Sequence, residues 1–149
     1  MNTIYADYAA ATPVDARVFA VMQPYFADRF YNPSATYLAA KQVRRDLEAA
    51  RQGVAGALGA RTSEIVFTAG GTEANNLAIH GVMRLFPGKK IAVSAIEHDS
   101  VLAAAHVYDC MEVPVMPDGL LDVANFERAI DDNTVLVSIM YANNEVGAI

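Results

Sequence analysis

Several residue types and patterns are scarce in the 149-residue sequence. It contains no tryptophan and only one cysteine, Cys110, so no disulfide can form within the chain, and we expect a reducing compartment, the cytoplasm. No apolar run approaches the ~20 residues of a membrane span, and the residues after Met1 lead into no signal-peptide core. The sequence therefore predicts a cytoplasmic protein that does not use a membrane.

Positive charge is also scarce. The sequence has 11 Lys and Arg against 17 Asp and Glu, for a net charge of −6, and its basic residues are scattered except for Arg44-Arg45 and Lys89-Lys90. Nucleic acid and anionic lipid are poor partners for such a chain. The hydrophobic fraction of 54% is high for one domain, which predicts apolar surface that meets a partner or another part of the protein.

Metal-binding patterns are absent as well. No two of the three histidines, His80, His98 and His106, have the four-residue helical spacing of a zinc site. The run Asp131-Asp132-Asn133 lacks the glycine and the distal glutamate of a calcium loop. We expect no metal site.

The first 60 residues carry two helical patterns. Thr12-Pro13-Val14-Asp15 predicts an N-cap at Thr12 and a proline at the first helical position, and this helix should fade before the turn at Tyr31-Asn32-Pro33-Ser34. A longer helix is expected from about Tyr37 until Gly59.

Strand and helix patterns alternate beyond Glu64, without an internal repeat. Turn signals occur at Pro87-Gly88 and Asp118-Gly119. The pattern predicts strands near 64–68, 90–95, 111–115 and 134–139, and helices near 72–85, 98–108 and 122–131. Such alternation indicates right-handed crossovers in an α/β fold with a mainly parallel sheet and flanking helices.

The stretch from Glu64 to Ile79 is expected to form a strand, a tight turn and a helix. Gly70 and Gly71 would let the backbone take positive φ, and Thr72 would stand where the helix begins. Free N–H groups and the helix dipole then make an anion site suited to phosphate. The alternative is that Thr72 only caps a helix. Neither the Gly-Lys-Ser/Thr of a nucleotide loop nor a dinucleotide Gly-x-Gly-x-x-Gly is present.

Three polar clusters follow predicted strands: Thr68 to Asn76, Glu97-His98-Asp99, and Asn143-Asn144-Glu145. The carboxyl ends of parallel strands meet at one edge of a sheet, where ligands bind. We expect the three clusters at a single site.

Five motifs, in this order and spacing, resemble the amino-terminal part of the cysteine desulfurases, which are pyridoxal-phosphate enzymes of fold type I in the class V aminotransferase group. The motifs are the segments 5–13 (YADYAAATP), 32–34 (NPS), 67–78 (FTAGGTEANNLA), 97–98 (EH) and 138–147 (SIMYANNEVG). The resemblance covers essentially the whole chain. It implies that residues 1–149 are a partial cofactor-binding domain, with an extended and helical segment over about 1–60 and no complete second domain.

The resemblance assigns roles to four residues. The backbone of Gly71 and the side chain of Thr72 match the cofactor-phosphate site, His98 matches the histidine that stacks on the pyridine ring and assists proton transfer, and Asn144 matches the asparagine beside the cofactor 3-oxygen and the substrate carboxylate. Each has a plainer interpretation, since His98 could cap a helix and Asn143-Asn144 could form an ordinary turn. His80 and His106 are expected to be structural.

The sequence also departs from the family pattern. Tyr31, Ala35 and Tyr37 stand where the family has glycine, a second serine and a histidine, and Ala11 replaces a threonine. These changes question the usual behaviour of the loop over 31–38.

The covalent groups of the family reaction lack credible candidates in this sequence. The lysines are Lys41, Lys89 and Lys90, and the last two precede a predicted strand, at the edge opposite the expected site. Cys110, at the start of another strand, resembles a small hydrophobe more than a reactive thiol. The resemblance places the Schiff-base lysine, the pyridinium aspartate and the catalytic cysteine after Ile149.

The implied function is part of a desulfurase that converts L-cysteine to L-alanine and passes sulfur to an enzyme persulfide for iron–sulfur cluster or thio-cofactor synthesis. The 149 residues alone should be inactive. The implied partners are the remainder of the desulfurase or a complementary chain, a second subunit in a homodimer, and a sulfur-acceptor protein. Two alternatives stay open: another class V enzyme, such as a selenocysteine lyase or an aminotransferase, and a non-catalytic interaction module that pairs an open sheet edge or an apolar face with a partner.

Overall fold

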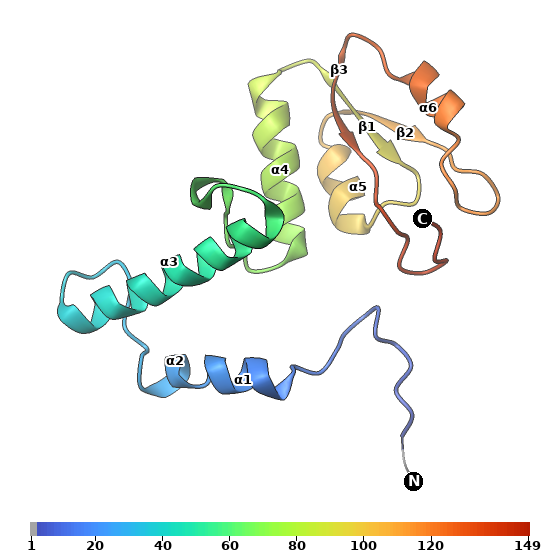
Figure 1. Ribbon diagram of the computed structural model, residues 1–149. Helices are drawn as coiled ribbons and strands as arrows, with labels where there is room; N and C mark the ends of the chain where they lie inside the picture. The colour runs from blue at the N-terminus through green and yellow to red at the C-terminus, as the bar shows by residue number, and fades with distance from the viewer. Residues whose placement is uncertain (1–2) are drawn as a thin grey trace. The chain divides into compact units, whose positions relative to one another are not determined.

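The computed structural model describes residues 3–149, which form two compact units, one ending at Phe67 and one running from Thr68 to Ile149 (Figure 1). The first unit contains α1 (Ala16–Met22), α2 (Pro24–Ala27), α3 (Leu38–Leu58) and the 3₁₀ turn η1 (Thr62–Glu64). The second contains α4 (Gly71–Leu85), β1 (Lys90–Ser94), α5 (Asp99–Ala105), β2 (Asp109–Val113), α6 (Val123–Ala129) and β3 (Thr134–Ser138).

The two helical patterns of the first unit form helices, but the first begins later than expected. Asp15, not Thr12, is the N-cap of α1, because its carboxylate accepts a hydrogen bond from the backbone N–H of Arg17 at 2.8 Å. The long helix α3 ends as predicted, at Gly59 with a φ of 66°. The turn before it is also present, with Asn32 accepting from the backbone N–H of Ser34 at 2.9 Å.

Much apolar surface of the first unit is exposed. Phe26 is 73% exposed and Leu58 is 70% exposed, while only Ala40 and Ala55 are buried on α3. The unit therefore has little core of its own within the described residues, which agrees with the expectation that the chain carries apolar surface for other contacts.

The strand predicted over 64–68 does not form, and this prediction was wrong. Thr62–Glu64 make a 3₁₀ turn, and Ile65 is extended, with φ −94° and ψ 122°, but pairs with no strand in the described part of the chain. Its carbonyl oxygen instead accepts a hydrogen bond from Arg51 at 2.6 Å. A β-branched segment becomes a strand only where a neighbour supplies the ladder of hydrogen bonds.

The second unit has a three-stranded parallel sheet in the order β2-β1-β3, which confirms the α/β prediction (Figure 1). Strand β2 starts two residues earlier than expected, because its register pairs Asp109 with Lys90. Strand β1 is central, and its last four residues are buried. The β1–β3 pairing contains an irregularity between Lys90 and Ile91.

The core of this unit lies between β1 and the helices α4 and α5. Its buried members are Ile79, Met83, Ile91, Val93, Val101, Ala104 and Ala105. The chain steps from β1 to β2 in one direction and from β2 back past β1 to β3 in the other, so right-handed crossovers place α5 and α6 on opposite faces. Accordingly, no residue of α6 belongs to this core.

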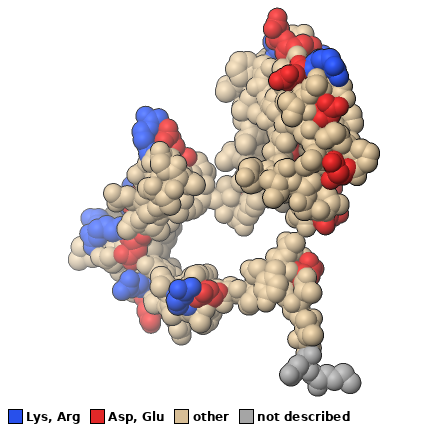
Figure 2. All heavy atoms as spheres, turned by 45° about the vertical axis from the view of Figure 1, so that its right-hand side comes forward, with Lys and Arg blue, Asp and Glu red and all other residues tan. Residues whose placement is uncertain are grey.

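The surface carries charges of both signs. Figure 2 shows Lys and Arg interspersed with Asp and Glu, and wide uncharged areas between them, without a continuous basic patch on this face. No helix among residues 3–149 is both long and apolar enough to cross a bilayer.

Candidate functional site

The loops that follow β1 and β3 meet at the carboxyl edge of the sheet. These two strands are neighbours and run parallel, so their carboxyl ends lie side by side. A cavity of about 360 Å³ opens there, lined by Ile96, His98, Asp99, Asn143, Asn144, Glu145 and Val146. Two of the polar clusters expected at one site therefore share one cavity.

The third cluster forms the N-terminus of α4. Gly70 is the N-cap, and no side chain among the described residues caps this end of the helix. The 15-residue helix thus directs the free N–H groups of its first turn toward an open cavity of about 580 Å³, lined by Ala69, Gly70, Gly71, Thr72, Glu73 and Asn76. Its dipole places positive potential at the same point.

The conformation of the two glycines differs from the prediction. Gly70 has a φ of 170°, which is extended backbone open to any residue, and Gly71 is helical, so neither needs positive φ. Thr72 is the second helical residue and not the N-cap. A Cβ built on either glycine meets nothing within 4 Å, so the approach to the N–H groups is open. Uncapped donors with clear access fit a phosphate group.

One carboxylate lies near this anion site. Glu73, in the first turn of α4, accepts a hydrogen bond from the backbone N–H of Ala69 at 2.6 Å. This charge-assisted hydrogen bond to the Glu73 carboxylate fixes the turn that precedes Gly70. The Glu73 carboxylate does not bind the backbone N–H groups of Gly71 and Thr72 in this contact.

His98 is the N-cap of α5, so the plainer interpretation, that this residue caps a helix, is correct. Its Nδ1 accepts a hydrogen bond from the backbone N–H of Ser100 at 3.1 Å and lies 2.8 Å from the Ser100 Oγ. Ser100 Oγ in turn accepts a hydrogen bond from Asn75 Nδ2 on α4 at 2.9 Å. These contacts join the α4 terminus to the cavity that His98 lines.

The two asparagines after β3 divide their roles. Asn143 builds the loop: its Oδ1 accepts hydrogen bonds from the backbone N–H groups of Glu145 and Val146 at 2.9 Å, and its Nδ2 donates to the carbonyl oxygen of Ile96 at 3.2 Å. Asn144 is exposed on the cavity wall. The loop held by Asn143 therefore leaves the amide of Asn144 available to a ligand.

Glu97 is a site residue whose role the sequence analysis did not identify. It is 8% exposed, and its Oε1 accepts hydrogen bonds from Ser94 Oγ at 2.7 Å and from the backbone N–H of Met140 at 2.5 Å. The carboxylate thus fixes the loop that carries His98 to the segment that leads to Asn144. Its place directly before His98 in a polar cluster was the available signal.

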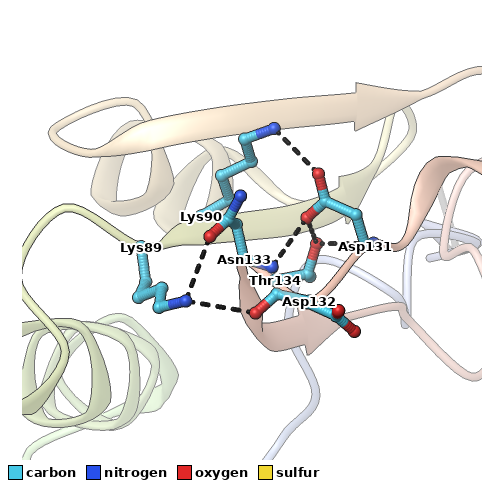
Figure 3. Close-up of polar contacts among 6 residues, drawn as sticks. All are labelled: Lys89, Lys90, Asp131, Asp132, Asn133 and Thr134. Carbon is cyan, nitrogen blue, oxygen red and sulfur yellow. Dashed lines mark hydrogen bonds and ion pairs between the residues drawn. The ribbon is translucent and has the colours of Figure 1, made fainter.

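The lysines of the second unit lie away from this edge. Lys90 begins β1, and its Nζ contacts Asp131 Oδ2 at 3.2 Å, while Lys89 Nζ donates to the Asp132 carbonyl oxygen at 3.1 Å and to Asn133 Oδ1 at 3.0 Å (Figure 3). Both therefore act at the amino end of the sheet, as predicted. Lys41 lies on α3 in the first unit.

Cys110 lies in β2 and packs against the core of the second unit. Partial burial raises the pKa of its thiol, and the negative charges of Glu112 and Asp109 raise it further. A raised pKa keeps the sulfur protonated at neutral pH, which agrees with a structural role.

The other two histidines also have structural partners. His80 Nδ1 lies 2.8 Å from the Tyr108 hydroxyl, and His106 Nε2 lies 2.6 Å from Glu112. Within residues 3–149, no group of three His, Cys, Asp or Glu side chains is arranged to hold a metal ion.

Comparison with known proteins gives a consistent result. The sequence profile of the family described as Aminotransferase class-V matches residues 4–149. The cysteine desulfurase IscS of Dictyoglomus turgidum is 40% identical over 153 residues, covering 98% of this chain and 39% of that protein. The IscS of Rickettsia akari is 42% identical, with coverages of 98% and 38%.

Solved structures give the same relationship. A NifS-like protein superposes with a TM-score of 0.89 at 34% identity, over 95% of this chain and 41% of that one. The protein described as SspA in complex with cysteine has a TM-score of 0.88 at 39% identity, over 96% and 43%. The chain thus spans about two fifths of the length of these relatives. The curated relatives named above are cysteine desulfurases, and this chain belongs to the class V aminotransferase family.

Proposed function

We propose that this chain supplies part of the pyridoxal-phosphate site of a cysteine desulfurase: the phosphate pocket and two of the side chains around the pyridine ring. One observation supports this proposal most directly: the Asn75–Ser100–His98 contacts connect the uncapped N-terminus of α4 to the cavity lined by His98 and Asn144. Pyridoxal phosphate, when bound, supplies an electron sink for chemistry at the Cα and Cβ of an amino acid.

Each residue contributes a contact that its position allows. The backbone N–H groups of Gly71 and Thr72, with the Thr72 hydroxyl, would donate hydrogen bonds to the phosphate. The amide of Asn144 would donate to the ring oxygen and to a substrate carboxylate without adding charge. His98 would lie against the ring, from its position at the start of α5.

The complete reaction needs groups that these residues do not provide. A Schiff-base lysine, a carboxylate for the pyridinium nitrogen and a persulfide-forming thiolate would come from a further stretch of the same polypeptide or from a complementary chain. A neighbour solved in complex with cysteine supports L-cysteine as the substrate. We further propose a homodimer that works in the cytoplasm and hands sulfur to an acceptor protein for iron–sulfur cluster synthesis.

Equilibrium dialysis of the 149-residue protein against pyridoxal phosphate and against pyridoxal tests the phosphate pocket. We expect pyridoxal phosphate to bind at least roughly tenfold more tightly, because charge-assisted hydrogen bonds contribute about 1.5–3 kcal/mol. Thr72→Ala should weaken only pyridoxal phosphate, whereas Thr62→Ala in η1 should change neither ligand. Equal binding of the two ligands, or equal effects of the two variants, would contradict the assignment.

Borohydride reduction followed by intact-mass measurement tests whether any lysine of this chain forms a Schiff base with pyridoxal phosphate. We expect no stoichiometric adduct and no L-alanine from L-cysteine above the level given by free pyridoxal phosphate, because Lys89 and Lys90 are held at the opposite end of the sheet. A single adduct that maps to Lys41, Lys89 or Lys90 would show that the chain holds the cofactor covalently.

A further inference from the structure

His98 has two ring nitrogens, and the contacts at one of them determine where the ring proton lies. The backbone N–H of Ser100 points to Nδ1 at 3.1 Å. An amide N–H can only donate, so Nδ1 must offer its lone pair. In the neutral ring the proton is therefore on Nε2.

The side-chain contacts fit the same tautomer, whose direction the backbone N–H of Ser100 sets. Asn75 Nδ2 donates to Ser100 Oγ at 2.9 Å, which leaves the Ser100 hydroxyl proton free to point to His98 Nδ1 at 2.8 Å. Ser100 is 8% exposed, so water competes little for this hydroxyl. A proton on Nδ1 would face the backbone N–H of Ser100, and the Ser100 hydroxyl would then have to turn away and accept from the ring.

We propose that Asn75 and Ser100 are positioning residues that hold His98 as the Nε2–H tautomer and present Nε2 as a hydrogen-bond donor to a ligand in the cavity that His98 lines. The tautomer follows from the contacts within the chain. Its consequence for a ligand rests on the proposed function: while α5 stays capped, the ring donates from Nε2 to the bound molecule, and it must leave the cap before Nε2 can accept a proton.

The hydrogen bonds from Asn75 through Ser100 to His98, called the relay below, also couple two parts of the site. Asn75 lies one turn into α4, the helix whose N-terminus we assign to phosphate, and Ser100 lies in the first turn of α5. A shift of α4 relative to α5 would therefore change the bond to His98 Nδ1. Occupancy of the phosphate site and the orientation of the imidazole are expected to depend on each other.

Two-bond ¹H–¹⁵N correlation NMR of the ¹⁵N-labelled 149-residue protein, without any ligand, tests the tautomer separately from the function. The sequence has three histidines, and loss of one signal set in His98→Gln assigns His98. At a pH above the imidazole titration we expect a roughly tenfold excess of the Nε2–H form. A proton on Nδ1, or the averaged pattern of a free imidazole, would overturn the proposal even if pyridoxal phosphate binds.

Two variants and one matched control test the relay. Ser100→Ala removes the hydroxyl and should lower the tautomer excess about threefold, while the backbone N–H remains. Asn75→Asp replaces a donor with an acceptor and should lower the excess further, because the Ser100 proton would turn toward the carboxylate. Ser63→Ala, at an exposed serine in η1 of the first unit, is the control and should have no effect. The same tautomer ratio in all three variants would show that the side chains do not position the ring.

Discussion

Glu97 Oε1 accepts a hydrogen bond from the backbone N–H of Met140, which lies 43 residues later in the chain. The same oxygen accepts from Ser94 Oγ at the end of β1. The bond holds the two loops of the candidate site together, so its removal should affect both stability and ligand binding.

Glu97→Ala should lower the free energy of unfolding by about 2–3 kcal/mol, since it leaves a buried hydroxyl and an N–H group without their acceptor. Glu97→Gln keeps one acceptor and should cost less. Glu145→Ala serves as the control, because Glu145 is exposed and its side chain should matter by no more than about 0.5 kcal/mol. Urea titrations measure all three, and equal midpoints would rule out this role of Glu97.

Replacing the two neighbouring asparagines should give opposite results. Asn143→Ala removes two bonds accepted within the loop and two donated bonds, to the Ile96 carbonyl oxygen and to Met140 Sδ, and should cost about 1–3 kcal/mol of stability. Asn144→Ala should leave stability within about 0.5 kcal/mol but weaken pyridoxal phosphate binding. Thermal melts and dialysis distinguish the two effects. If Asn144→Ala were the more destabilising change, our division of their roles would be wrong.

Gly71→Ala should separate stability from binding. Gly71 is helical and a Cβ there meets nothing within 4 Å, so alanine should stabilise the ligand-free protein by up to about 1 kcal/mol. The same methyl group would stand where we place the phosphate and should weaken pyridoxal phosphate binding. Gly81→Ala, also within α4 and without near neighbours, is the control that should leave binding unchanged. Unchanged binding in both variants would move the phosphate away from this turn.

Cys110 should react slowly with alkylating reagents. Burial and the charges of Glu112 and Asp109 raise the pKa of its thiol, so at neutral pH little thiolate is present. The rate of alkylation by iodoacetamide should rise at higher pH than for free cysteine. Glu112→Gln should increase the rate at neutral pH, and Glu127→Gln on α6 should not. A thiol that reacts faster than free cysteine would contradict a structural role.

The amino end of the sheet should contribute a small acid-dependent stability. The hydrogen bond from Lys90 and then the backbone N–H of Asn133 lower the pKa of Asp131 below its ordinary value of 3.8. A lowered folded-state pKa means that the stabilisation is present above the unfolded pKa and is lost as the pH falls through the folded pKa. Lys90→Met should therefore raise the pKa of Asp131 in a ¹³C NMR titration.

Lys89→Met is the matched control for this titration. Lys89 binds the carbonyl oxygen of Asp132 and the side chain of Asn133, and not the carboxylate of Asp131. Lys89→Met should therefore shift the pKa of Asp131 less than Lys90→Met does. Equal shifts in the two variants would mean that general positive charge, and not the specific bond, sets the value.

The alternation of strands and helices beyond residue 90 was predictable from the sequence, because those strands find partners for their backbone hydrogen bonds within the chain. Each of the three strands has a parallel neighbour, and β1 is buried in the way that its apolar run implies. The segment over 65–67 has β-branched and aromatic character as well, yet it has no neighbour to pair with among the described residues. Residue preference was therefore correct about the extended backbone of Ile65 and wrong about the strand.

The details of the site were less predictable, because they depend on atoms from distant segments. Glycine composition suggested positive φ at Gly70 and Gly71, but an extended N-cap followed by a regular helix gives the same open N-terminus. The capping role of His98 was foreseen as an alternative, whereas the bond from Asn75 through Ser100 requires the packing of α4 against α5. No local pattern reports such a contact.

The irregularity between Lys90 and Ile91 lies at the amino end of the β1–β3 pair, and the pairs from Ile91 to Val93 are regular. The turn over 131–133 is held mainly by the long side chains of Lys89 and Lys90, which can follow a shifted turn, so related proteins should tolerate insertions or deletions there. The segment over 139–142 offers no such slack, because Met140 and Asn143 are bonded to Glu97 and Ile96. A deletion there would break these bonds and displace Asn144 from the cavity that it lines, so length variation among relatives should be concentrated at the edge away from the site.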